Sequence, residues 1–503
     1  MSSAAPKPWL LFATVLVIAT AGIVYELVAG AMASYVLGDS VTQFSLVIGV
    51  YLSALGFGAY LSKFIEKNLE KTFVEVELAT AVAGGFLAPG LYLTYAHSTA
   101  FQLVLYAGVV LVGTLVGIEL PLLIRILRKQ VSLADLLAKA LSFDYVGSLI
   151  GSVLFSLVLV PQLGLVRTSL VFGLLNALVA IGSTYLFDKE KTLRGARWRG
   201  VFVAVLIFVA FTQANRITAW GEEAIYSDQI IFTKQTPYQR IVVTKGRASF
   251  QLFLSGHLQF SSADEHRYHE ALVHPVMSAV ERPRHVLVTG GGDGLAVREI
   301  LRYPDVERVT LVELDPEMTK LAREFPLLRE LNEGSLHRPE VEIIHADAMV
   351  WLKETDRTFD VIIVDFPDPN NFSLGKLYTT SFYRMARQRL NDGGAMVVQS
   401  TSPMFARKAY WCIARTIEAA GFVVRPYHAF VPSFGEWGYV LAKKEGFEIP
   451  TQVKVEGLRW LDDETMRSLF VLGRDMEEVP VEINRLNNQL LVHYYEQEWR
   501  RWN

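Results

Sequence analysis

Residues 285–303 read HVLVTGGGDGLAVREILRY, in which an apolar run, a glycine-rich turn and an amphipathic stretch follow one another. The run 285–291 predicts a buried strand, and 295–303 predicts a helix. Glycine at such a turn lets the backbone approach a ligand closely, where a Cβ atom would clash. The stretch therefore predicts a Rossmann-like α/β domain that holds a ligand at Gly290–Gly294.

The alternation of strands and helices continues toward the C-terminus. Further strands are predicted at 308–314, 341–347, 360–366 and 395–400, with a helix around 317–325. This order predicts a doubly wound, mostly parallel sheet. Upstream, segments rich in β-branched and aromatic residues predict a small antiparallel β unit and then a helix, at 229–233, 239–245, 249–256 and 264–280.

Acidic residues follow the predicted strands, at the sheet edge where α/β folds bind ligands. Asp293 lies in the glycine turn, Glu313 ends the second strand at the usual position of a ribose-binding acid, and Asp347 before Ala348 follows the third. The fourth strand ends in Asp365, with Asp368 three residues later. Any one of these acids has the alternative reading of a solvated surface charge. Together they predict an acid-lined pocket.

The ligand of this pocket is expected to be a cationic nucleoside without a phosphate. Phosphate sites use Lys or Arg and a P-loop, and the sequence has neither near Gly290. An adenosyl sulfonium fits these requirements. The formal net charge of −3 gives no indication of a nucleic-acid partner. His266, His269 and His274 do not match a common zinc spacing, so no metal is expected.

The N-terminal part has a different composition. The chain is 51% hydrophobic and 20% charged, with a mean hydropathy of +0.28, and the apolar excess precedes about residue 215. Seven segments are long enough to cross a bilayer, which predicts a multi-pass α-helical membrane domain with the lipid bilayer as partner. They lie near 9–36, 42–62, 73–95, 101–124, 143–163, 165–187 and 200–217.

Lys and Arg gather in every second loop of this part, which the positive-inside rule assigns to the cytoplasm together with the N-terminus. Seven crossings of the cell (inner) membrane then put the C-terminal domain outside the cytoplasm. If 200–217 does not cross, the domain stays inside, and the sequence leaves this open. The basic residues are Lys63, Lys67 and Lys71, then Arg125, Arg128, Lys129 and Lys139, then Lys189, Lys191, Arg194, Arg197 and Arg199.

Glu26, Glu119 and Asp144 fall at membrane depth in this interpretation. Placing a carboxylate in the apolar interior of a membrane costs free energy, so an acid at this depth suggests a function. One hypothesis is that these acids line a cavity for organic cations. The alternative is hydrogen bonding between helices. Unchanged polyamine binding and flux after neutralising each of the three would contradict the cavity.

The soluble part resembles the spermidine/spermine synthase (polyamine aminopropyltransferase) family, and the whole chain resembles its bacterial membrane-fused branch. The resemblance covers residues 222–445. It implies transfer of an aminopropyl group from decarboxylated S-adenosylmethionine, a co-substrate and not a cofactor, to a small amine such as putrescine. The motifs are TPYQRIVV at 236–243, LFLSGHLQFSSADEHRYHEALVHP at 252–275, VTLVELDP at 309–316, DVIIVDFPDP at 360–369, KLYTTSFY at 376–383 and GGAMVVQSTSP at 393–403.

The resemblance also implies a role for individual residues. Asp365 is the expected base. The acceptor amine is expected at Tyr268 and Asp368, with His269 beside them and Glu436 as a further carboxylate. Asp293 is expected to meet the aminopropyl ammonium. The nucleoside side is expected to comprise Gln239, Gln259, Gly290, Gly292, Glu313, Asp347 and Ala348. The chain departs from the family pattern at Phe366-Pro367 and at Ser255, which leaves the identity of the amine open.

Two other functions stay open on the sequence. One is a methyltransferase that uses S-adenosylmethionine, whose α-carboxylate Asp293 would repel. The other is a transporter or sensor that binds a polyamine without reacting. The expected domains are the membrane part at 1–217, the β unit with its helix at 218–283, the Rossmann-like methyltransferase-type domain at 284–445 and a helical tail at 446–503. A homodimer is expected by family analogy alone.

Overall fold

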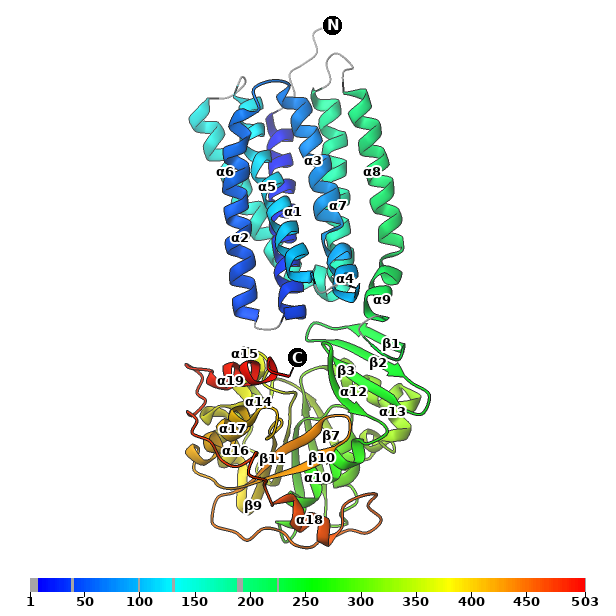
Figure 1. Cartoon of the computed structure of the whole chain (residues 1–503), viewed down its shortest axis with the longest axis vertical. Coiled ribbons are helices and arrows are strands. Elements are labelled where there is room, and N and C mark those ends of the chain that lie inside the picture. Colours follow the sequence, from blue (N-terminus) through cyan, green and yellow to red (C-terminus); the bar gives the residue numbers. More distant parts are fainter. Residues whose placement is uncertain are drawn as a thin grey trace. The chain divides into compact units, whose positions relative to one another are not determined.

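The computed structural model describes residues 8–37, 40–97, 100–128, 132–187, 193–223 and 226–502. The chain forms two compact units, Met1–Ile230 and Ile231–Asn503, which are described separately (Figure 1). The helical unit runs beyond the expected end at residue 217, because α9 continues it. The basic residues Lys129, Lys189 and Lys191 lie outside the described part of the chain.

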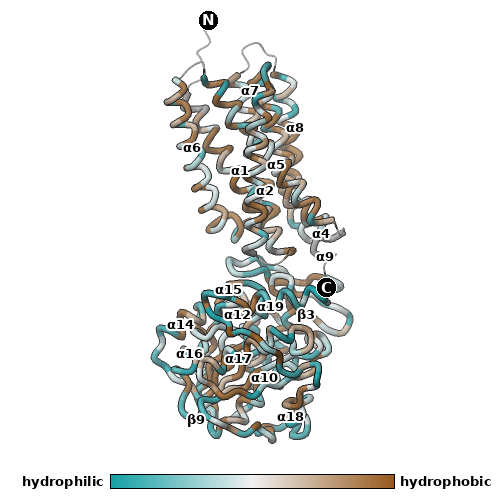
Figure 2. Tube along the Cα trace, turned by 60° about the vertical axis from the view of Figure 1, so that its left-hand side comes forward, coloured by the Kyte–Doolittle hydropathy of each residue, from teal (hydrophilic) through white to brown (hydrophobic). Residues whose placement is uncertain are grey.

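The first unit is a bundle of long apolar helices, and hydrophobic residues cover these helices along most of their length (Figure 2). Six helical stretches of the described residues are long and apolar enough to cross a membrane. The helices are α1 Pro8–Leu37, α2 Ser40–Leu61, α3 Leu69–Gly85, α4 Leu87–His97, α5 Phe101–Leu127, α6 Leu133–Leu154, α7 Val160–Phe187, α8 Arg194–Thr212 and α9 Ala214–Glu223.

One of these stretches, Leu133–Phe187, has 55 residues, which as a straight helix would measure about 80 Å. Gly164 breaks it with φ 73° and ψ 175°, a conformation that glycine adopts readily. Helices α6 and α7 both contact α1, which has only 30 residues. The chain therefore folds back, and the stretch passes along the bundle twice, with the break between the expected segments 143–163 and 165–187.

Buried polar side chains connect the helices of the bundle. Glu119 is fully buried and accepts a hydrogen bond from the Thr80 hydroxyl at 2.6 Å. Glu77, which the sequence analysis missed, accepts from Asn176 at 3.1 Å, and the Tyr25 hydroxyl donates to the same asparagine. Hydrogen bonding between helices is thus observed at Glu119. The cation cavity stays a prediction.

The second unit begins with an antiparallel sheet in the order β1-β2-β3-β4. The strands are β1 Gln229–Gln235, β2 Arg240–Lys245, β3 Phe250–Leu254 and β4 His257–Ser261. Ser255 and Gly256 form the β3–β4 turn with φ 49° and 85°, so Ser255 occupies a tight-turn position. Helix α10, Glu265–Ser278, leads from this sheet to the next.

A seven-stranded sheet forms the centre of this unit, in the order β10-β11-β9-β8-β5-β6-β7. Strands β5 to β9 are parallel, and β10 and β11 form an antiparallel hairpin at one edge. The sheet is therefore mixed. The strands are β5 His285–Gly290, β6 Arg308–Glu313, β7 Val341–His345, β8 Phe359–Asp365, β9 Leu390–Gln399, β10 Val423–Val431 and β11 Gly435–Lys443.

Side chains of β5 alternate between two hydrophobic cores. Val286 and Val288 join the core that contains α10 and α11, whereas Leu287 joins the core that contains α14, α16 and α17. Helices thus cover both faces, as the doubly wound pattern predicts. The remaining helices of four or more residues are α11 Leu295–Ile300, α12 Pro316–Glu324, α13 Pro326–Leu331, α14 Ala348–Glu354, α15 Phe372–Gly375, α16 Thr380–Arg389, α17 Arg407–Ala419, α18 Asp463–Leu469 and α19 Leu490–Trp499.

The tail after residue 445 is less helical than expected. Within the described residues 446–502, α18 and α19 are the only helices, and the chain between them is irregular. The tail packs on its own unit, since Leu491 joins the core with α17.

Candidate active site

The predicted acids gather at one edge because parallel strands place their carboxyl ends together. Asp365 ends β8 and lies opposite Gly290, which ends β5. Glu313 ends β6, opposite His345 of β7. The glycine turn follows β5, whose two neighbours in the sheet are β8 and β6. The register alone therefore brings together three of the expected site positions.

The glycines at 290 and 292 are required by this crowding. Gly290 has φ 78°, and a Cβ atom on it would lie 2.2 Å from the Asp365 carbonyl oxygen. A Cβ atom on Gly292 would lie 2.8 Å from Glu313 Oε2. The Gly290 contact is with backbone and cannot be relieved by a rotamer change, whereas a Cβ atom at 292 would force the Glu313 side chain to move. The turn therefore packs directly against Asp365 and Glu313.

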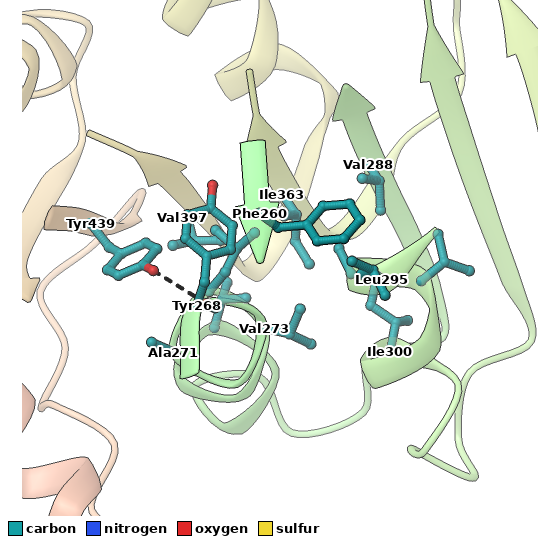
Figure 3. Packing of buried hydrophobic residues seen from close by; sticks show 14 of the residues in the cluster. Phe260, Tyr268, Ala271, Val273, Val288, Leu295, Ile300, Ile363, Val397 and Tyr439 are labelled. Carbon is teal, nitrogen blue, oxygen red and sulfur yellow. Dashed lines mark hydrogen bonds between the residues drawn. The ribbon is translucent and has the colours of Figure 1, made fainter. Parts of the chain in front are cut away.

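Asp365 is bound by a tyrosine from α10. The Tyr268 hydroxyl donates to Asp365 Oδ1 at 2.6 Å, and the Tyr439 hydroxyl donates to the Tyr268 carbonyl at 3.2 Å (Figure 3). Burial raises the pKa of Asp365 to about 6, although the nearby His269 and the Tyr268 hydroxyl act to lower it. A carboxylate with such a pKa is suited to accept a proton near neutral pH.

His269 is fixed by a buried ionic network. Its Nδ1 lies 2.9 Å from Glu265 Oε2, and both Glu265 carboxylate oxygens also accept from Arg298 at 3.0 Å. Burial alone would lower the pKa of His269, but its hydrogen bond to Glu265 raises it above the usual value. The charge of His269 also acts on Asp293 and Asp365. The network thus favours the protonated form of the His269 ring.

Asp293 lies two residues before the start of helix α11. Its Oδ1 accepts from the Leu295 backbone N–H at 2.9 Å, and burial raises its pKa above the usual value. Asp368 follows on the loop after β8, where Gln399 Nε2 donates to it at 2.8 Å and the Thr401 hydroxyl at 3.1 Å. Burial raises the pKa of Asp368 to about 6. Three partly buried acids therefore share this edge.

On the other side of the turn, Glu313 accepts from the Asp315 N–H at 2.9 Å, and burial raises its pKa to about 7. Asp315 in turn accepts from Gln239 at 3.0 Å and from the Thr236 hydroxyl at 2.8 Å. The expected residue Gln239 is thus tied to Asp315, whose backbone N–H binds Glu313. The sequence analysis missed Thr236, although it lies in the TPYQRIVV motif.

Asp347 has two partners of its own. Its Oδ1 caps α14 by accepting from the Met349 N–H at 2.9 Å, and its Oδ2 forms a salt bridge with Lys376 at 2.5 Å. Burial would raise the pKa of Asp347, but the Lys376 hydrogen bond and the backbone donors lower it below the usual value. Ala348 is the first residue of α14. An adenine contact at this pair stays a prediction.

Other expected residues are less closely connected to the acids. Gln259 donates to the His257 carbonyl of its own strand at 3.1 Å, and Glu436 binds His428 Nδ1 at 2.7 Å. His274 pairs with Glu299, so the three histidines of the segment 266–274 do not share one partner. Among the described residues no group of three or more His, Cys, Asp or Glu could hold a metal ion.

The parallel strands with this glycine turn place the catalytic unit in the Rossmann-like fold class. Proteins of similar sequence show the family. Residues 265–452 match the spermine/spermidine synthase domain. A polyamine aminopropyltransferase of Leptospira interrogans is 50% identical and aligns over 98% of this chain and 99% of its own length. Polyamine aminopropyltransferase 2 of Ralstonia nicotianae is 48% identical and aligns over 97% of this chain and 98% of its own length. The polyamine aminopropyltransferase of Mycobacterium tuberculosis is 37% identical and aligns over 97% of this chain and 96% of its own length.

A crystal structure of spermidine synthase in complex with the transition-state analogue AdoDATO is 27% identical, covers 49% of this chain and 86% of its own, and gives a TM-score of 0.45. The full-length sequence relatives carry the assignment. The chain belongs to the polyamine aminopropyltransferase (spermine/spermidine synthase) family and is a transferase. A polyamine binder without activity and a methyltransferase are both set aside by these relatives.

Proposed function

We propose that the enzyme transfers the aminopropyl group of decarboxylated S-adenosylmethionine to putrescine or a related amine, which gives spermidine or a longer polyamine and methylthioadenosine. The observation that carries this proposal is the Tyr268–Asp365 pair beside the glycine turn, with a pKa of about 6 for Asp365. This carboxylate is ionised at neutral pH, which suits it both to attract an ammonium and to take its proton.

In the proposed reaction the acceptor ammonium loses one proton to Asp365. The freed nitrogen lone pair attacks the aminopropyl carbon bonded to the sulfonium, and the carbon–sulfur bond breaks. Its electron pair goes to sulfur, which leaves as the neutral thioether methylthioadenosine, and the new secondary amine carries a proton. The sulfonium is already a good leaving group, so the enzyme's main contribution is to align two cations with its acids.

Asp293 is proposed to select the donor. Its partly buried carboxylate attracts the aminopropyl ammonium and repels the α-carboxylate that S-adenosylmethionine carries. Purified enzyme given either donor with a panel of diamines is expected to release methylthioadenosine from the decarboxylated donor. Release of S-adenosylhomocysteine from S-adenosylmethionine as the main product would contradict the proposal.

We propose that the helical unit anchors the enzyme in the cell membrane. Its six apolar stretches support seven crossings, because the break at Gly164 divides the 55-residue stretch. Successive spans alternate in direction, so the ends of α2 and α5 and the start of α8 lie at the same end of the bundle as the start of α1 (Figure 1). These helix ends contain or adjoin the described basic residues Lys63, Arg125 and Arg197. Helix α8 ends at the opposite end. The homodimer stays a prediction.

Cysteine labelling is expected to show that the catalytic unit lies outside the cytoplasm. The single native cysteine, Cys412, is fully buried, so new cysteines report their own position. Glu66 lies in the basic loop between α2 and α3, and Glu456 lies on the catalytic unit, both exposed. In intact cells or spheroplasts an impermeant maleimide is expected to label Glu456→Cys and to spare Glu66→Cys.

After lysis, both cysteine variants are expected to be labelled, and the unmodified chain is the background control. Protection of both positions in intact cells would mean that α8 does not cross. Labelling of Glu66→Cys alone would show that the orientation is the reverse of the one that the positive-inside rule predicts.

A further inference from the structure

The salt bridge between Asp347 and Lys376 lies at the same sheet edge as the ribose-side acid Glu313. Asp347 follows β7, and the Ala346 N–H donates to the Glu313 carbonyl oxygen at 3.1 Å. The chain just before Asp347 is therefore bound to the end of β6. A base attached to a ribose at Glu313 is accordingly expected near this salt bridge.

Both side chains of the salt bridge have hydrogen-bonding capacity left for a ligand. Asp347 Oδ1 accepts from the Met349 and Val350 N–H groups at 2.9 and 3.2 Å, and Oδ2 accepts from Lys376 Nζ at 2.5 Å. A carboxylate oxygen can accept a second hydrogen bond, and a lysine ammonium has further donors. The side chains of Lys376 and Asp347 are 33% and 27% exposed, so a ligand can reach both.

The main chain on both sides of Lys376 is held by a buried asparagine of the tail. Asn484 is fully buried, and its Nδ2 donates to the carbonyl oxygens of Gly375 at 3.2 Å and Tyr378 at 3.1 Å. Lys376 lies between these two residues in the chain. Its backbone is therefore fixed before a ligand binds, which reduces the entropy lost on binding.

An acceptor atom beside a donor atom matches the edge of adenine that carries the amino group. The amino group donates a hydrogen bond, and a ring nitrogen next to it accepts one. The oxygen and nitrogen of an asparagine side chain bind this edge with two hydrogen bonds for the same reason. Asp347 Oδ2 and Lys376 Nζ form such a neighbouring pair, with the acceptor and the donor on different side chains.

We infer that Lys376 is a specificity-determining residue of the donor site, which donates a hydrogen bond to a ring nitrogen of adenine while Asp347 accepts from the adenine amino group. This inference rests on the proposed function, because it takes the nucleoside of decarboxylated S-adenosylmethionine as the ligand. It adds a cationic partner from a separate segment to the expected contact of Asp347 with adenine.

The matched test is Lys376→Met against Lys353→Met. Lys353 is exposed and lies on α14, the helix that Asp347 caps. Calorimetry on the full chain in detergent measures the Kd of methylthioadenosine, the proposed product, which carries the same base as the donor. Lys376→Met is expected to raise this Kd about tenfold, the usual effect of one hydrogen bond that involves a charged group. Lys353→Met is expected to change it less than about twofold. An equally small change in Lys376→Met would overturn the inference.

Base analogues separate a direct contact of Lys376 with adenine from simple support of Asp347. The 1-deaza and 7-deaza analogues of methylthioadenosine each replace one ring nitrogen beside the amino group by a C–H group. The unmodified enzyme is expected to bind one of the two analogues about tenfold more weakly than methylthioadenosine. Lys376→Met is expected to bind that analogue and methylthioadenosine equally, because the donor to the nitrogen is gone. A penalty of the same size in both enzymes would show that another group contacts the nitrogen, and would overturn the inference.

The same analogues cover the case that Lys376→Met does not fold. Equal binding of both analogues and methylthioadenosine to the unmodified enzyme would by itself overturn the inference. The proposed function fails separately, if the unmodified enzyme releases no methylthioadenosine from the decarboxylated donor with any amine. An active enzyme whose nucleoside binding is insensitive to Lys376→Met refutes only the role of Lys376.

Discussion

Asp365→Asn is expected to lower kcat about 10²- to 10⁴-fold, the usual contribution of a general base. The amide cannot take the proton of the acceptor ammonium, whereas it keeps the size of the side chain and can still accept from Tyr268. Methylthioadenosine release under saturating donor and amine measures the change. The donor KM is expected to stay within a few-fold, because Asp293 and Glu313 are intact.

Asp392→Asn is the matched control. Asp392 is exposed and pairs only with Lys444 at 3.2 Å, so the same chemical change there is expected to leave turnover unaffected. Near-normal turnover of Asp365→Asn would show that another group takes the proton. Asp368 would then be the first group to test, since its pKa is also raised to about 6.

The pH profile provides an independent check on the same base. Burial raises the folded pKa of Asp365 to about 6, and the base works only when ionised. The value of kcat/KM is therefore expected to be high above pH 6 and to fall as the pH decreases through this value. Tyr268→Phe removes a hydrogen bond that lowers the pKa, so its acid limb is expected to move to higher pH. An unchanged limb in Asp365→Asn would contradict the assignment.

Arg298→Met is expected to destabilise the catalytic unit by about 3–5 kcal/mol, as is usual when one partner of a buried ion pair is removed. Arg298 is 8% exposed, whereas its partners Glu265 and Glu299 are each 1% exposed. Without the guanidinium, both carboxylates stay buried with fewer donors. The expected decrease in the melting temperature of this unit is on the order of 10 °C, measured by differential scanning fluorimetry on the full chain in detergent.

Arg338→Met is the control for this experiment. Arg338 forms an exposed pair with Glu340 at 3.2 Å, and such pairs contribute about 0–1 kcal/mol. Its melting temperature is expected to change by no more than about 2–4 °C. Equal effects of the two substitutions would mean that the Arg298 network does not stabilise the fold.

Much of the catalytic unit could be predicted because its sequence pattern is local. Apolar runs bounded by glycine and acid residues gave strands β5, β6 and β8, and parallel pairing then brought Asp365 and Glu313 to one edge. The break at Gly164 inside α7 could also be located, between the expected segments 143–163 and 165–187, because a spanning helix has limited length. In each case a short stretch of sequence is enough to predict the structural element.

What escaped prediction depends on pairing between distant segments. The β10–β11 hairpin is paired over nine residue pairs, from Val423 with Lys443 to Val431 with Gly435, but its register cannot be read from either strand alone. The partners of Asp368 at Gln399 and Thr401 come from residues 31 and 33 positions further along the chain. Likewise, nothing in the sequence near Asp347 shows that Lys376 binds it.

The packing of the tail makes it part of the folding core of the catalytic unit. Met466 and Leu469 of α18 lie in the hydrophobic core that contains α10, and Leu491 of α19 lies in the core on the other face of the sheet. A chain cut at residue 445 would therefore leave apolar surface of both cores in contact with water. Such a truncation would weaken the cooperative folding of the sheet from both of its faces at once.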